Sequence, residues 1–247
     1  MSKNFVILGT ARSGTTFFAK TLQQQQDVWI PPFTNLEPFN PFNMDRAVAQ
    51  YGTHLYDQDS VVQSIIKQGN DQGYKYVGFK TFMVFHPDLL GLIERNQLDV
   101  FVMLRKDIWK ILASHLIAID NSDFSGSSTK YKPYRYDNSP REARRVLSLF
   151  NELCKALWWM ENVFSQHPRL IHKFYLEDVD QAPLSFDPID LYFNRSIVLD
   201  YNYNNDVDIS HYIENYDEFQ SLIRNWCKKM PQHYSALPDY VRDQLEL

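Results

Sequence analysis

The sequence has few cysteines, no excess of basic residues and no long apolar run. Its two cysteines, Cys154 and Cys227, form neither a CxxC pair nor a disulfide framework, so a reducing compartment is expected. The formal net charge of -5 argues against a general binder of nucleic acid or of membrane surfaces. No apolar run approaches transmembrane length, and the first one begins too close to Met1 for a signal peptide. We therefore expect a cytoplasmic protein that binds neither membrane nor nucleic acid.

Residues 5–22, FVILGTARSGTTFFAKTL, are the most informative stretch. The continuous apolar run at 5–8 predicts a strand that is buried on both faces of a parallel sheet. Helical spacing begins at Thr15, and the loop between the two elements is bracketed by Gly9 and Gly14. A strand, a glycine-bracketed loop and a helix in this order point backbone N–H groups at a phosphate. The stretch therefore predicts an anion site, although an ordinary tight turn remains an alternative.

This loop lacks the lysine of the Walker A motif, G-x-x-x-x-G-K-[ST]. The two glycines have the right spacing and Thr16 occupies the hydroxyl position, but Thr15 stands where the lysine belongs. The cation of the loop comes earlier, at Arg12. Because the Walker lysine reaches the β- and γ-phosphates of ATP, its absence disfavours ATP turnover without disfavouring phosphate binding.

Strands and helices alternate along the rest of the chain. This order implies right-handed crossovers and a parallel sheet, and 247 residues suffice for one domain of this kind. We predict an α/β fold with a central parallel sheet flanked by helices, with residues 1–247 as a single domain. Further strands are expected at 74–82 and 99–104, and helices at 44–68 (interrupted near Gly52), 89–96, 108–119, 140–166 and 214–229.

Cations follow two of the predicted strands, where a Mg²⁺-nucleotide enzyme would be expected to carry an aspartate. Lys80 ends one strand, and the pair Arg105-Lys106 ends the next. Because the carboxyl ends of parallel strands face the ligand crevice, these cations are suited to neutralise a second anion. Asp107 is either a displaced metal ligand or, as we favour, part of the first turn of the next helix. Ser114, about two turns into that helix, is placed to face the same anion as Arg105.

Two loops contain further candidate residues. Residues 29–42 are too rich in proline for a helix or a central strand, and within this extended aromatic loop Glu37 precedes Pro38. Glu37 is either a solvated loop residue or a general base whose pKa burial would raise. Residues 120–139 form a long loop that is either a mobile lid or a solvated segment.

Two motifs together resemble the sulfotransferases that use 3′-phosphoadenosine 5′-phosphosulfate (PAPS). GTARSGTTFFAKTL resembles their 5′-phosphosulfate loop, and VFVMLRKDIWKILASH is similar to their 3′-phosphate motif, a strand ending in arginine with a serine on the next helix. A third segment, LIHKFYLEDVDQAP, resembles their strand followed by a Tyr-Glu-Asp-type turn. The resemblance implies a P-loop-like three-layer fold and sulfuryl transfer without a metal.

The resemblance also assigns roles to particular residues. It places Arg12 at the transferring sulfuryl group and the leaving phosphate, Ser13, Gly14, Thr15 and Thr16 around the 5′-phosphate, and Arg105 and Ser114 around the 3′-phosphate. The usual arginine-to-serine interval is matched by Lys106 to Ser114, whereas a bacterial branch similar to trehalose sulfotransferase carries a doubled basic pair. Either Arg105 or Lys106 is therefore the main clamp.

Two residues are candidates for the catalytic base. Glu37 resembles the acidic residue that the bacterial branch places on the loop after the first helix. His86 resembles the histidine that follows a Lys-Thr pair in the cytosolic branch, but it lies farther from Lys80-Thr81 here, and Pro87 can make it a helix-entry residue. We rank Glu37 first.

The sequence thus predicts transfer of a sulfuryl group from PAPS to a hydroxyl or amine of a small acceptor, with adenosine 3′,5′-bisphosphate as the product and no metal. A carbohydrate is one candidate acceptor, and the oligomeric state is left open. The alternatives are a P-loop nucleotide kinase and a non-catalytic sensor that binds adenosine bisphosphate.

Overall fold

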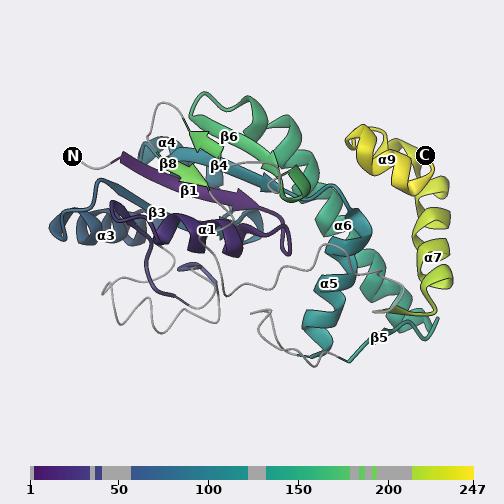
Figure 1. Ribbon diagram of the computed structural model, residues 1–247. Helices are drawn as coiled ribbons and strands as arrows, with labels where there is room; N and C mark the ends of the chain where they lie inside the picture. Colours follow the sequence, from purple (N-terminus) through teal and green to yellow (C-terminus); the bar gives the residue numbers. More distant parts are fainter. Residues whose placement is uncertain are drawn as a thin grey trace.

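The fold is built around five parallel strands in the order β2-β3-β1-β4-β6 (Figure 1). The structure, a computed structural model, describes residues 3–33, 37–40, 57–121, 132–178, 184–186, 191–193 and 213–247. The strands are β1 (Lys3–Gly9), β2 (Val28–Trp29), β3 (Tyr76–Phe82), β4 (Asp99–Leu104) and β6 (Leu170–Tyr175). This confirms the predicted α/β fold with a central parallel sheet flanked by helices.

Helices pack on both faces of this sheet because its strands are apolar on both sides. In β1, Phe5 and Ile7 pack in one cluster with α1 (Thr15–Gln23), whereas Val6 and Leu8 pack in the other with α3, α4, α5 and α6. The helices of the second face are α3 (Gln58–Asp71), α4 (Leu89–Arg95), α5 (Ile108–Asp120) and α6 (Pro140–Asn162). The continuous apolar run of β1 thus has the two-sided burial that the sequence predicts.

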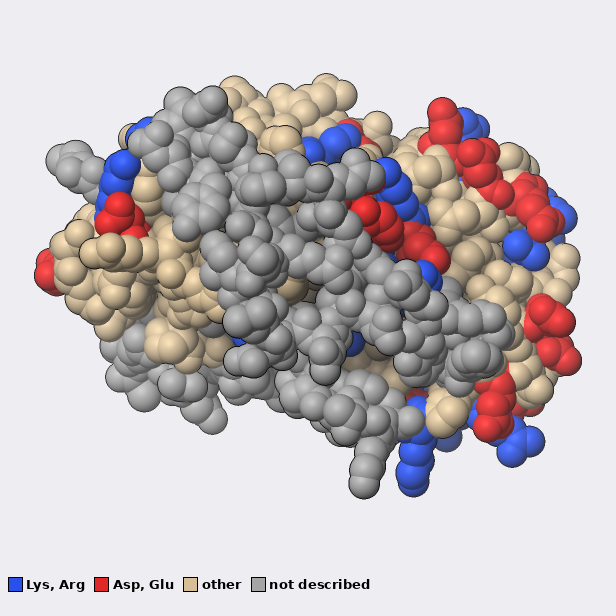
Figure 2. Space-filling view, viewed as in Figure 1, with Lys and Arg blue, Asp and Glu red and all other residues tan. Residues whose placement is uncertain are grey.

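Three C-terminal helices lie at the end of the sheet towards which the strands point (Figure 1). They are α7 (Tyr216–Lys229), α8 (Pro231–Tyr234) and α9 (Asp239–Leu245). Figure 2 shows acidic and basic side chains intermingled over this part of the molecule. None of the helices in the described ranges is long and apolar enough to span a membrane.

Several element boundaries differ from the prediction. The short edge strand β2 was not predicted because only two residues pair before the prolines at 31 and 32. The helix that starts at Pro140 ends at Asn162 and is followed by a 3-10 turn, Phe164–Gln166, and helices α8 and α9 were not predicted. Of the predicted helix 44–68, the part before residue 57 lies outside the described residues.

The predicted lid, residues 120–139, is described only in part. Residues 122–131 lie outside the described residues. Strand β5 (Tyr134–Arg135) pairs in parallel with β9 (Ile213–Glu214), and Tyr134 and Tyr136 are buried with their rings edge-on to Phe219. The Tyr134 and Tyr136 side chains belong to the main core, and the lid role of residues 120–139 stays a prediction. The remaining short strands, β7 (Leu184–Phe186) and β8 (Leu191–Phe193), pair antiparallel.

Candidate functional site

The glycine loop leaves the sheet at its carboxyl edge and has a constrained backbone. Gly9, the last residue of β1, lies between Phe82 of β3 and Met103 of β4 in the strand register. Arg12 and Gly14 have φ values of 65° and 87°, in the left-handed region. At Gly14 a Cβ atom would lie 2.8 Å from the Leu176 side chain, so glycine is required there for both its φ value and its space. Gly14 immediately precedes α1, whose N-terminus therefore faces the loop.

Side chains of the loop are held by hydrogen bonds within it and across the sheet. The Ser13 hydroxyl donates to the Thr10 carbonyl at 2.7 Å and is fully buried. The Arg12 Nε donates to the Ser114 hydroxyl, on α5, at 2.7 Å. Because β1 and β4 are neighbours, this contact joins the loop after β1 to the helix after β4. The two sequence motifs, 102 residues apart at these positions, meet at one edge of the sheet.

A buried ion pair lies beside the loop. Lys80 Nζ lies 2.5 Å from Glu37 Oε1 and donates to the Thr16 hydroxyl at 2.5 Å. The other Glu37 oxygen accepts from Asn40 Nδ2 at 2.6 Å. The Lys80 and Glu37 side chains are only 1% and 4% exposed. Lys80 therefore connects the candidate base directly to the first turn of α1.

The electrostatics around this pair favour an anion. Burial lowers the pKa of Lys80, the Glu37 carboxylate raises it, and the positive charges of Arg12 and Lys20 lower it further. The positive charges of Arg12 and Lys20 thus act on the positive charge of Lys80, and Glu37 is the carboxylate in direct contact with Lys80. The Thr10 hydroxyl is buried and has no hydrogen-bond partner within the part of the chain that the structure describes. An added anion would relieve the repulsion among the cations.

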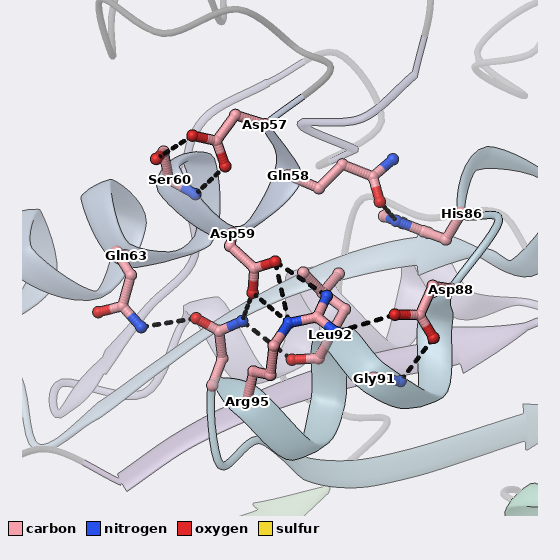
Figure 3. Close-up of polar contacts among 11 residues, drawn as sticks. Asp57, Gln58, Asp59, Ser60, Gln63, His86, Asp88, Gly91, Leu92 and Arg95 are labelled. Atoms are coloured by element: carbon pink, nitrogen blue, oxygen red, sulfur yellow. Dashed lines mark hydrogen bonds and ion pairs between the residues drawn. The ribbon is translucent and has the colours of Figure 1, made fainter.

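His86 is held as a neutral side chain. Its Nε2 lies 2.6 Å from the Thr81 hydroxyl. Its Nδ1 lies 2.8 Å from Gln58 Oε1 (Figure 3). The Gln58 amide nitrogen donates to the Phe85 carbonyl at 2.8 Å, so the amide oxygen must face the ring. His86 therefore has its proton on Nδ1 and accepts the Thr81 hydroxyl proton at Nε2. Burial lowers the pKa of His86 to about 4, so the ring is neutral at pH 7.

The helix that carries Gln58 is anchored at its N-terminus (Figure 3). Asp57 caps α3 by accepting from the Ser60 backbone N–H at 3.1 Å. Arg95 of α4 pairs with Asp59 at 2.9 Å and with Asp88 at 2.8 Å. These contacts fix the start of α3 against α4, which keeps the Gln58 amide in place beside His86.

The burial of His86 predicts a pH-dependent stability. Because its pKa is lower in the folded chain than in the unfolded chain, the unfolded state binds more protons as the pH falls from 6.5 to about 4. We expect the free energy of unfolding to fall over this window, with about 3 kcal/mol from His86 and a further share from His115, whose pKa burial also lowers to about 4. Urea denaturation at several pH values should show a flatter dependence for His86→Asn. Replacing the exposed His233 by Asn is the control, and equal slopes for wild type and His86→Asn would contradict the prediction.

The two basic residues after β4, Arg105 and Lys106, differ in burial and in their ion-pair partners. Arg105 is buried, and its Nε lies 3.5 Å from Glu177 Oε1. The Lys106 side chain is 44% exposed and pairs with Asp178 at 2.6 Å. Asp107 is the N-cap of α5 and accepts from the Lys110 N–H at 2.9 Å, which confirms the favoured reading of this residue as part of the helix start.

The structure therefore brings together most of the site residues predicted from the sequence. Arg12 meets Ser114, and Thr16 meets Glu37 through Lys80. Sequence reasoning named Lys80 only as a strand-end cation, although a lysine inside the apolar strand YVGFKTF is itself a signal of a buried charge. Gln58 was missed, because nothing local marks it as the partner of a histidine 28 positions away.

Comparison with protein-family models, with curated proteins and with solved structures finds no match for this chain.

Proposed function

We propose that the protein is a cytoplasmic PAPS-dependent sulfotransferase that acts on a hydroxyl or amine of a small acceptor. The observation that carries the proposal is the 2.7 Å hydrogen bond from Arg12 to Ser114. It joins the glycine loop to the helix that follows Arg105, and these are the two segments whose sequences resemble the 5′- and 3′-phosphate motifs of that family. One nucleotide with phosphates at both ends would bridge such segments. This supports phosphate binding at this edge of the sheet, as in a P-loop-like fold.

The chain offers donors and cations for both ends of that nucleotide. Ser13, Gly14, Thr15 and Thr16 would hold the 5′-phosphosulfate on the loop and the first turn of α1. Arg105 and Ser114 would hold the 3′-phosphate. PAPS supplies an activated sulfuryl group and a phosphate that gains negative charge as it leaves. The cations Arg12, Lys20 and Lys80 would stabilise this charge where it develops.

Glu37 is the better candidate for the base. Its carboxylate is buried, and Lys80 links it to Thr16 on the loop, so it lies beside the place where the sulfuryl group would be held. The carboxylate would take the proton of the acceptor as the acceptor oxygen or nitrogen attacks sulfur in line. His86 is less suited to this role, because its unprotonated nitrogen already accepts the Thr81 hydroxyl proton and its pKa is lowered to about 4.

The second candidate function is a non-catalytic sensor of adenosine 3′,5′-bisphosphate. It is favoured by the contacts of Glu37, since one oxygen is paired with Lys80 and the other accepts from Asn40. A carboxylate that stays in these contacts would not take a proton from an acceptor.

The proposal predicts selective stabilisation by the doubly phosphorylated nucleotide. At a hundredfold excess over its Kd, adenosine 3′,5′-bisphosphate is expected to raise the melting temperature by about 5 °C or more. ADP and Mg·ATP at the same concentration are expected to raise it less, because they lack the 3′-phosphate. Thermal denaturation with the three ligands tests this. A larger shift with Mg·ATP would overturn the proposal in favour of a kinase.

A further inference from the structure

The turn between β4 and α5 is held by the last helix of the chain. Gln244, on α9, accepts from the Ile108 backbone N–H at 3.1 Å through its Oε1. Its Nε2 donates to the Lys106 carbonyl at 2.8 Å and to the Tyr240 carbonyl at 2.7 Å. All three partners are main-chain groups. Because an N–H group can only donate and a carbonyl can only accept, the orientation of the amide is unambiguous. Gln244 thus spans the turn that carries Arg105, 138 positions away from Lys106.

A second side chain, from the segment that follows β6, holds the same turn. Glu177, in the 3-10 turn Leu176–Asp178 after β6, accepts from the Lys106 N–H at 2.9 Å and from the Asp107 N–H at 3.3 Å. The same carboxylate lies 3.5 Å from Arg105 Nε. The main chain on the C-terminal side of Arg105 is therefore fixed by Glu177 and Gln244 together, which restricts the direction in which the guanidinium can point.

Helix α9 is a firm support for Gln244. Val241 and Leu245 are fully buried in the main core. The Tyr240 ring packs edge-on to Tyr175 of β6 with centroids 5.6 Å apart. Arg224 of α7 pairs with Glu246 at 3.2 Å. Because α9 is attached to the core, to the sheet edge and to α7, it can transmit a fixed position to the turn.

We propose that Gln244 is a positioning residue for Arg105, so that recognition of a 3′-phosphate depends on the C-terminal helix. The inference rests on the proposed function, in which Arg105 binds that phosphate. Gln244 itself does not touch the nucleotide. Its amide keeps the turn in the conformation in which Arg105 is directed towards the site, and without it the guanidinium is less well placed.

The test separates the 3′-phosphate from the rest of the nucleotide. Isothermal titration calorimetry gives the Kd of adenosine 5′-phosphate and the Kd of adenosine 3′,5′-bisphosphate, and the ratio of the first to the second measures the contribution of the 3′-phosphate. Gln244→Met keeps the size of the side chain and removes its hydrogen bonds. We expect the ratio to fall by about fivefold, with the Kd of adenosine 5′-phosphate changed by less than about twofold.

Gln220→Met is the matched control. Gln220 lies on the neighbouring helix α7, is half-buried and donates to the Tyr216 hydroxyl at 2.9 Å, so its loss is expected to leave the ratio unchanged. Should Gln244→Met fail to fold, Gln244→Glu keeps the acceptor for Ile108 and loses the donor to Lys106, and the same ratio should fall by about twofold or more.

The possible failures are distinguishable. If the wild type prefers the 3′-phosphate and the Gln244 variant keeps the full ratio, the positioning role is refuted while the proposed function stands. An equal loss of affinity for both nucleotides would also refute it, because that result indicates general damage to the fold. A wild type that shows no preference for the 3′-phosphate overturns the proposed function, and the role of Gln244 falls with it.

Discussion

Lys80→Met is expected to lower the free energy of unfolding at pH 7 by about 3–5 kcal/mol, because it leaves a buried carboxylate without its cation. The Lys80 and Glu37 side chains are only 1% and 4% exposed and their charged atoms lie 2.5 Å apart, so solvent screens this pair very little. Lys80 also donates to the Thr16 hydroxyl, and this hydrogen bond is lost as well. Urea denaturation measures the effect.

The control for this substitution is Lys67→Met. Lys67 and Asp71 form an ion pair at the same 2.5 Å distance, but their side chains are 75% and 62% exposed, so a change below about 0.5 kcal/mol is expected. The double variant Lys80→Met/Glu37→Met should recover much of the loss, because it removes both buried charges. Equal effects of Lys80→Met and Lys67→Met would show that Lys80 and Glu37 do not form a buried pair in solution.

Glu37→Gln is expected to lower kcat for sulfuryl transfer by about 10²–10⁴-fold, the usual contribution of a general base. The amide can keep its hydrogen bonds to Lys80 and, after rotation of the Asn40 amide, to Asn40, but it cannot accept the acceptor proton. Because the substitution removes negative charge beside the anion site, the affinity for adenosine 3′,5′-bisphosphate should be unchanged or higher. A screen of acceptors with labelled PAPS identifies the substrate for the measurement, and calorimetry gives the affinity.

A carboxylate outside the site provides the control. Glu94→Gln on α4, where the side chain is 55% exposed, is expected to leave both the rate and the affinity unchanged. A retained rate in Glu37→Gln would remove Glu37 as the base and leave His86 as the candidate. If the wild type transfers no sulfuryl group to any acceptor although it binds the nucleotide, the sensor function is favoured.

The fold could be predicted from the sequence where burial is two-sided and continuous. Strand β4 and the start of α6, with Ser139 as N-cap and Pro140 in the first turn, agree with the prediction because their signals are local. The strand β2 and the helices α8 and α9 could not be predicted in the same way. They are short, and they are stabilised by packing against distant parts of the chain, which no local pattern reveals.

The same distinction between local patterns and distant contacts applies to the candidate site. The loop after β1 and the basic pair after β4 are visible as motifs, and their meeting follows from the order of parallel strands. The partners of these residues are not visible. That Glu37 faces Lys80, that His86 is locked by Gln58 and that Glu177 lies against Arg105 are facts of tertiary structure between residues 28 to 72 positions apart. The sequence therefore indicates the candidate site residues but not the side chains with which they pair.

The carboxylate of Glu177 has one more consequence. The amino end of α5 is largely closed to an incoming anion, because side-chain oxygens already accept from its backbone N–H groups. Glu177 accepts from residues 106 and 107, Gln244 from residue 108 and Asp107 from residue 110. The amino end of α1 begins at Gly14 without a side-chain cap. A ligand with two phosphates would therefore meet main-chain donors at one end and side chains at the other. Substitutions can change every donor at the side-chain end, whereas the main-chain donors of the glycine loop persist under substitution, so selectivity for the nucleotide would evolve more readily at Arg105 and its neighbours than at the glycine loop.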